Sequence, residues 1–349
     1  MPFRSQRSHL AALILAGAVL GLSACALVGR GDVPPPAAEA PAREQLAESA
    51  AGAEPAVIAP ARPLPWREID GGVLSDHFLT GPDAVRFMRP VAVAARGPLV
   101  YIVDAGLGRL FSYDTAQDRL RVVLELKGVV RGEVTDIFIA RDLSFFLADA
   151  DGGRVLHFDR DGRLLRTLQD PVNIGRPVTV AVNDQTGYIF IADGFNDDVL
   201  VYNPAGLLTG AIGVRGEGAG QFRGITALAQ GPDGYYIATR YGASRVQVMG
   251  FDGAYLASFQ PDTVTFPTAI AVRADNRAYV SDYLSDDIKV FDRGRLVLTL
   301  GGHGGGPGRF RRITDLWLDG DYLYVADSLN GRIQMLPLTS EDLPPAGTH

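Results

Sequence analysis

The sequence has little of what most crosslinked folds, metal sites and nucleic-acid-binding surfaces require. Its 349 residues include one cysteine and five histidines. A single cysteine excludes a disulfide framework within the chain. The formal net charge is −7, so no basic surplus favours nucleic acid or an anionic membrane surface as the partner. The apolar run at 10–22 has 13 residues, fewer than the roughly 20 that cross a bilayer as a helix.

That short apolar run has the organisation of a secretory signal. Arg4 and Arg7 precede it, and it ends in Leu22-Ser23-Ala24-Cys25. This ending resembles the bacterial lipobox, in which the cysteine is lipidated and becomes the first residue of the mature protein. The resemblance implies a lipoprotein signal peptide at 1–24 and a lipid anchor on Cys25. Ala26, in place of Asp, further implies an outer-membrane lipoprotein facing the periplasm. The alternative is an ordinary signal peptide with an incidental cysteine.

Residues 25–65 have the composition of a tether. They are rich in Ala, Pro and Glu and show neither the helical nor the strand hydrophobic period. A flexible chain of about 40 residues has an end-to-end distance on the order of 35 Å. We therefore expect a linker that holds the folded domain clear of the membrane. Residues 338–349 form a polar C-terminal tail.

A short signature returns six times between these two segments. It consists of an apolar strand that ends in Asp, a brief loop and a second strand. The repeated positions are Asp104, Asp149, Asp193, Thr239, Asp282 and Asp327. They are separated by 45, 44, 46, 43 and 45 residues, which is about the period of one four-stranded propeller blade.

Each repeat divides into four short strands. In the second, these are 134–140, 143–148, 154–158 and 164–168, and Asp159-Arg160-Asp161-Gly162 forms a hairpin signal between the last two. The sequence thus predicts an all-β six-bladed propeller at 66–337 with four-stranded antiparallel blades. The sixth repeat runs into Pro337 without a fourth strand. We expect the N-terminal segment 73–79 to complete it and close the ring, which removes open sheet edges.

The repeats resemble a known family. Tyr324-Val325-Ala326-Asp327-Ser328-Leu329-Asn330-Gly331-Arg332-Ile333-Gln334 looks like an NHL repeat, as do the Gly-rich connection at 216–222 and the Arg176-Pro177 strand entry. The resemblance implies an NHL-type propeller over roughly residues 73 to 337. NHL-type propellers include protein-binding and RNA-binding modules and a few enzymes, so the resemblance implies a fold and leaves the activity open.

Blades three to five depart from the common loop pattern. The loop after the repeated position and the connections between blades share one face of a propeller of this topology. In blades one, two, four and six an arginine opens the third strand. These residues are Arg109, Arg154, Arg245 and Arg332, and where the repeated residue is Asp they can pair with it. Blades three and five have Asp198 and Asp287 there, and blade four has Thr239 in place of Asp.

The same three blades carry an aromatic residue within two positions of the repeated one. Arginine and aromatic side chains are enriched at binding hot spots. We therefore expect a partner-binding face formed by Phe195, Asp197, Asp198, Arg240, Tyr241, Arg245, Tyr283, Asp286 and Asp287. The alternative is a set of solvated acidic loops whose aromatic rings fold inward.

The acidic residues could instead hold a cation. Ca²⁺ takes several carboxylate and carbonyl oxygens, yet no Asp-x-Asp-x-Asp-Gly run with a downstream Glu is present. Asp136 and Asp315, near the starts of innermost strands, could line the central channel and would need a partner or an ion there. We expect no cofactor, and a bound Ca²⁺ or other cation is the alternative.

No catalytic constellation is evident in the sequence. The four histidines after the signal segment do not recur at one blade position, as a three-His zinc site would require. No Ser-His-Asp or cysteine nucleophile can be assembled. We expect a monomeric, non-catalytic binding or scaffold module for another cell-envelope protein, with no nucleic-acid partner. One alternative is an anionic saccharide or other small ligand at the arginines that recur at the blade entries, Arg89, Arg176, Arg223 and Arg311. The other is a metal-dependent lyase or lactonase-like enzyme.

Overall fold

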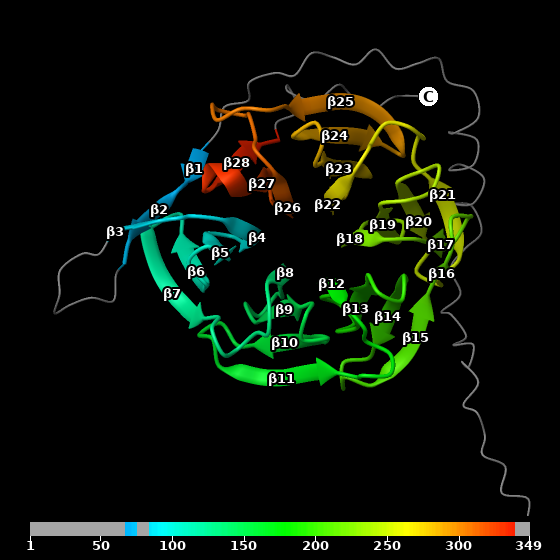
Figure 1. The fold of residues 1–349 in the computed structure, drawn as a ribbon, viewed down its shortest axis with the longest axis horizontal. Helices are drawn as coiled ribbons and strands as arrows, with labels where there is room; N and C mark the ends of the chain where they lie inside the picture. Colours follow the sequence, from blue (N-terminus) through cyan, green and yellow to red (C-terminus); the bar gives the residue numbers. More distant parts are fainter. Residues whose placement is uncertain (1–66, 75–83, 339–349) are drawn as a thin grey trace, which may run out of the picture. The chain divides into compact units, whose positions relative to one another are not determined.

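The computed structural model describes residues 67–74 and 84–338, which fold into six four-stranded antiparallel sheets arranged as the blades of a propeller (Figure 1). The predicted all-β fold is therefore confirmed. The signal segment, Cys25 and the tether lie outside the described residues. In the described part of the chain, no helix is long and apolar enough to cross a membrane.

Blades one to three follow one another along the chain. Blade one contains β4 (Pro90–Arg96), β5 (Leu99–Asp104), β6 (Arg109–Asp114) and β7 (Arg119–Glu125). Blade two contains β8 (Val134–Ile139), β9 (Phe145–Asp149), β10 (Arg154–Phe158) and β11 (Leu164–Gln169). Blade three contains β12 (Pro177–Val182), β13 (Ile189–Asp193), β14 (Asp198–Tyr202) and β15 (Leu208–Ile212).

The last three blades repeat this order until the final strand. Blade four contains β18 (Ile225–Gln230), β19 (Tyr235–Thr239), β20 (Val246–Met249) and β21 (Tyr255–Ser258). Blade five contains β22 (Pro267–Val272), β23 (Arg277–Asp282), β24 (Asp287–Asp292) and β25 (Arg295–Gly301). Blade six contains β26 (Ile313–Asp319), β27 (Tyr322–Asp327), β28 (Arg332–Pro337) and the N-terminal β1 (Arg67–Ile69).

Three small elements complete the described structure. A hairpin joins β2 (Gly71–Val73) to β3 (Ala84–Arg86), and a short parallel pair joins β16 (Val214–Arg215) to β17 (Gln221–Phe222). The 3₁₀ turn η1 (Ser328–Asn330) lies between β27 and β28.

The apolar core is divided among the interfaces between blades. Six clusters of buried side chains are present, one for each pair of neighbouring blades. Between blades one and two, for example, the rings of Tyr101 and Phe145 lie 5.0 Å apart. Inner strands such as β12 are buried along nearly their whole length, whereas the outer strand β11 is mostly exposed. This explains the continuous apolar runs of the inner strands, which pack on a blade at each side.

The repeated aspartates hold the blades' connections together. All five are 0–2% exposed. The Asp193 carboxylate, for example, accepts hydrogen bonds from the backbone N–H groups of Gly175 and Arg176, which enter its blade, and from those of Phe195 and Asn196 in its own loop. These N–H groups satisfy the hydrogen-bonding capacity of a carboxylate that is buried. The period therefore reflects this structural connection.

The ring is closed by an N-terminal strand, but at a different segment from the one expected. β1 pairs with β28 through the register Arg67–Met335 and Ile69–Ile333, so the prediction of 73–79 was wrong. The chain turns away after Ile69 because Gly71, at φ +146°, enters the β2–β3 hairpin. Leu74 then bridges to Leu120 of blade one, which accounts for its apolar character. Residues 75–79 lie outside the described residues.

Ile69→Ala tests this closure. Ile69 is 4% exposed and packs in the cluster between blades six and one, so we expect a loss of about 2–4 kcal/mol in the free energy of unfolding. Arg67→Ala, at an exposed position of the same strand, is the control and should change it by less than about 0.5 kcal/mol. Equal effects in urea unfolding would show that β1 does not close the ring.

Candidate functional site

The loops predicted to form the partner-binding face lie beside the segments that enter each blade. In five blades, the carboxylate at the end of the second strand bonds to the backbone of the entry segment, as Asp282 does with Thr265 and Phe266. The loop after the second strand and the entry segment therefore share one face. We call it the loop face.

Two of the predicted acidic residues occupy the left-handed turn of their loops. Asp197 and Asp286 have φ of +59° and +52°. Glycine fills the corresponding place in three other blades, at Gly108, Gly153 and Gly331, with φ of +65°, +59° and +66°. Asp tolerates this conformation better than most residues with a side chain. A carboxylate at this position can accept hydrogen bonds, which glycine has no side chain to do.

The carboxylates of Asp197 and Asp286 bridge neighbouring blades. The Oδ1 atom of Asp197 accepts hydrogen bonds from the N–H groups of Gly224 (2.7 Å) and Ile225 (3.3 Å), where blade four begins. Asp286 likewise accepts one from Arg312 (2.7 Å), where blade six begins. These two carboxylates therefore have a structural role, which is to join neighbouring blades.

Blade four lacks the carboxylate that the other blades have at the repeated position. The Thr239 hydroxyl donates to the carbonyl of Tyr241 at 3.0 Å, so it is not the acceptor that an aspartate provides in the other blades. The entry segment of blade four must then find its acceptor elsewhere, because an unpaired buried N–H is costly. Asp197 of blade three supplies it. The bridge is not confined to this exception, because Asp286 bonds to the entry of blade six, which retains Asp327.

Asp197→Gly tests this compensation. Glycine accepts the φ of +59°, so the substitution removes the carboxylate without adding backbone strain. We expect the free energy of unfolding to fall by about 1–3 kcal/mol because two N–H groups lose a charged acceptor. Asp262→Gly is the matched control, with φ of +60° at an exposed position. Thermal unfolding of both variants should therefore separate them, and equal stability would contradict the bridging role.

Three further predicted residues also turn away from solvent or make local contacts. Asp198 and Asp287 are 8% and 7% exposed, and the Asp287 carboxylate pairs with Lys289 at 2.9 Å. Arg245 donates to the carbonyl of Gly242 at 2.9 Å. The acidic loops therefore present little carboxylate to the loop face.

The other four predicted residues are exposed. Phe195, Tyr241 and Tyr283 are 65%, 52% and 37% exposed, and Arg240 is exposed as well. Tyr241 and Tyr283 each carry a guanidinium over the ring, from Arg223 at 5.0 Å and Arg312 at 5.5 Å. Arginine and aromatic side chains thus gather where blades four to six meet the loop face.

These contacts continue from blade to blade. The guanidinium of Arg240 lies 4.9 Å from the centre of the Phe266 ring, and that ring lies 5.5 Å from the ring of Tyr283. We call the whole set the arginine–aromatic strip; it consists of Arg223, Tyr241, Arg240, Phe266, Tyr283 and Arg312.

Phe266 and Arg312 are members of the strip that the sequence reasoning missed. Both lie in blade-entry segments, whereas the residues predicted for the partner-binding face lie in the loops after the second strand. A signal was available for Phe266. It precedes Pro267 at the place where blades one and three have Arg89-Pro90 and Arg176-Pro177. An aromatic ring thus replaces an arginine in blade five alone among these Pro-containing entries.

The strip is locally basic in a protein that is acidic overall. Arg223 pairs with Glu217, but within the described residues neither Arg240 nor Arg312 forms a salt bridge. The net charge of the chain is −7. A local positive potential on an acidic protein favours approach by an acidic surface.

The predicted pairing of a repeated aspartate with the arginine that opens the third strand is present in two blades. Asp149–Arg154 and Asp327–Arg332 each lie at 2.8 Å, whereas Arg109 pairs with Glu125. Within residues 67–74 and 84–338, no group of three or more His, Cys, Asp or Glu side chains is arranged to hold a metal ion.

Comparisons with known proteins support the fold. The sequence matches no protein-family model and no curated protein. A protein of unknown function from Bacteroides thetaiotaomicron superposes with a TM-score of 0.59 and 16% identity, over 77% of this chain and 72% of that chain. Virginiamycin B lyase from Staphylococcus aureus superposes with a TM-score of 0.55 and 10% identity, over 79% and 100%. At such identities the likeness establishes the propeller fold alone.

Proposed function

We propose that this propeller is a non-catalytic binding module of the bacterial cell envelope, which binds an acidic surface of another envelope protein. In this proposal the lipid on Cys25 anchors the chain in the outer membrane and the linker holds the propeller in the periplasm. The observation that carries the binding role is the arginine–aromatic strip. Two of its exposed guanidinium groups form no salt bridge among the described residues.

The chemistry of the strip supports a protein partner. Arginine and tyrosine are the side chains most often found at binding hot spots. A guanidinium that stacks on a ring is held in place while its N–H groups stay available for a carboxylate. Part of the side-chain entropy of binding is therefore already lost in the free protein. An acidic partner would supply the carboxylates that Arg240 and Arg312 lack.

The test is capture of partners from detergent-solubilised envelopes of the producing cells. The double variant Arg240→Glu, Arg312→Glu should lose an acidic envelope protein that the wild type retains, because like charges then oppose each other. The double variant Arg160→Glu, Arg293→Glu changes the charge equally at exposed hairpin positions between third and fourth strands and should retain it. Mass spectrometry quantifies each captured protein. Equal recovery with both variants, or loss of a polysaccharide instead of a protein, would overturn the proposal.

A further inference from the structure

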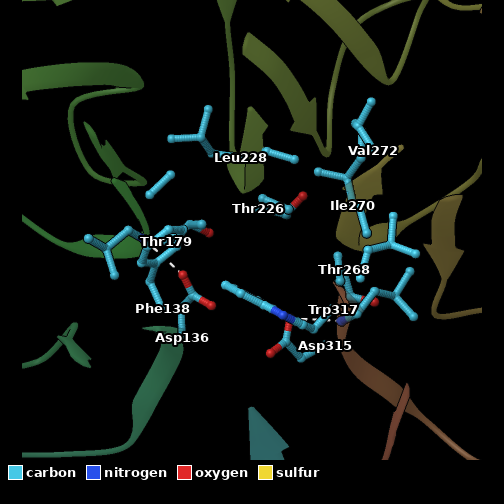
Figure 2. Close-up of a pocket in the computed structure, with 18 of the residues that line it drawn as sticks. Asp136, Phe138, Thr179, Thr226, Leu228, Thr268, Ile270, Val272, Asp315 and Trp317 are labelled. Carbon is cyan, nitrogen blue, oxygen red and sulfur yellow. Dashed lines mark hydrogen bonds between the residues drawn. The ribbon is translucent and has the colours of Figure 1, made fainter. Parts of the chain in front are cut away.

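The inner strands surround a cavity that the proposed function does not use. Its volume is about 220 Å³, equal to the liquid volume of roughly seven water molecules. Inner strands β8, β12, β18, β22 and β26 supply its walls, and Figure 2 shows side chains from several blades converging on it. A cavity of this size suits a small metabolite better than a peptide.

One layer of the inner strands carries both acids of the cavity wall. The layer follows the bulge near the start of each strand, and its members are Ala92, Asp136, Thr179, Ala227, Ala269 and Asp315. Ala227 and Ala269 line the cavity and leave space that larger side chains would fill. The acids come from blades two and six, the neighbours of blade one, and Figure 2 shows them on the same side of the cavity.

Both carboxyl groups are fixed by backbone donors of the next blade. The Oδ2 atom of Asp136 accepts from the N–H of Val180, and that of Asp315 accepts from the N–H of Val93, each at 2.8 Å. Burial raises the pKa of Asp136 to about 7 against the lowering effect of its backbone hydrogen bonds. Burial, together with the charge of Asp136, also raises the pKa of Asp315. The pair therefore retains protons at a pH where ordinary carboxylates are ionised.

The Thr179 hydroxyl is a polar group with no protein partner among the described residues. Thr179 is 9% exposed and lines the cavity, and the described part of the chain offers its hydroxyl no hydrogen bond. The hydroxyl is accessible from the cavity, so it is available to a bound molecule. A molecule in the cavity that carries a donor or an acceptor would satisfy it.

An aromatic pair lines the cavity two residues further along the same strands as the acids. Phe138 and Trp317 meet edge to face, with ring centroids 5.3 Å apart. The indole N–H of Trp317 donates to the carbonyl of Ala95 at 2.7 Å, which fixes the ring. Arg96, the cation among the lining residues, is paired with Asp184 at 2.8 Å.

We propose that the cavity binds a small organic cation with a primary ammonium group. Asp136 and Asp315 supply the opposite charge, the Thr179 hydroxyl accepts one ammonium N–H, and Trp317 and Phe138 pack on the alkyl part. Because an ammonium group favours ionised carboxyls, binding releases protons from the pair. Affinity should therefore rise with pH through about 7, as Asp136 ionises.

Fluorescence of Trp317 is the readout, in a Trp66→Phe background that leaves it the sole tryptophan. We expect n-butylammonium to produce a saturable change, and butan-1-ol, its neutral analogue, to bind at least about tenfold more weakly. Raising the pH from about 5.5 to about 7.5, across the raised pKa, should strengthen only the ammonium binding. No saturable change with n-butylammonium, or equal affinity for butan-1-ol, would overturn the proposal.

Substitutions locate the binding. Asp136→Asn keeps an oxygen for the N–H of Val180 and should weaken n-butylammonium binding about tenfold, and Thr179→Val about threefold. Asp161→Asn, at an exposed carboxylate outside the cavity, should leave it unchanged. Calorimetry in two buffers of different ionisation enthalpy measures the released protons. Unchanged affinity in Asp136→Asn and in Asp315→Asn would contradict the assignment even where Trp317 responds.

Discussion

Asp327→Ala is expected to lower the free energy of unfolding by about 3–5 kcal/mol, because it removes a buried carboxylate that pairs with a buried arginine and accepts several further hydrogen bonds. The Asp327 side chain is 0% exposed, and its Oδ2 atom lies 2.8 Å from Nε of Arg332, which is itself 8% exposed. It also accepts from the N–H of Arg311 and from the side chain of Gln334. Loss of the carboxylate removes all of these acceptors at once.

The effect should reach beyond blade six because Arg332 also helps to close the ring. Its Nη1 atom pairs with Glu68 of β1 at 2.9 Å, and its Nη2 atom donates to the carbonyl of Gly306 at 2.9 Å. Asp321→Ala, at an exposed position of the same blade, is the control and should cost less than about 0.5 kcal/mol. Urea unfolding separates the two. A loss below about 1 kcal/mol in Asp327→Ala would show that the repeated carboxylate is not a structural connection.

Tyr241→Ala is expected to weaken binding of the captured partner roughly thirtyfold, or about 2 kcal/mol. The ring is half-exposed and lies under the guanidinium of Arg223, which Glu217 holds in turn. A ring fixed in this way loses little entropy when a partner covers it. Tyr241→Phe keeps the ring and should retain most of the affinity.

The control for this prediction is Phe251→Ala. Phe251 and Tyr241 are both 52% exposed, but Phe251 belongs to the hairpin between the third and fourth strands of blade four. Its loss should leave the dissociation constant unchanged. If both alanine variants weaken binding equally, the effect is general and the strip is not the contact surface.

The fold was predictable because its signals are local. The interval between the repeated aspartates and the Gly-containing hairpins are properties of single blades, and each blade repeats them. The closing strand was misplaced because it is only three residues long. So short a strand carries little hydrophobic pattern, and the clearer pattern at Val73 and Leu74 reflects other contacts, a hairpin partner and a bridge to Leu120.

The candidate site was less predictable because its decisive contacts join different blades. The sequence marked Asp198, Asp287 and Thr239 as departures, but the bridge from the neighbouring Asp197 depends on where blade four begins in space. An acid beside an aromatic residue suggests a binding loop, whereas Asp197 and Asp286 fill left-handed turns and bond to the next blade. Phe266 joins the strip only through its contacts with Arg240 and Tyr283.

Site-specific photo-crosslinking in intact cells tests the central claim most directly. A photoreactive amino acid replaces Tyr241 in one strain and Phe251, equally exposed on a strand-connecting hairpin outside the strip, in the other. The proposed binding face predicts a crosslink from position 241 to one acidic envelope protein and none above background from position 251. The same adduct from both positions, or an adduct from position 251 alone, would contradict it.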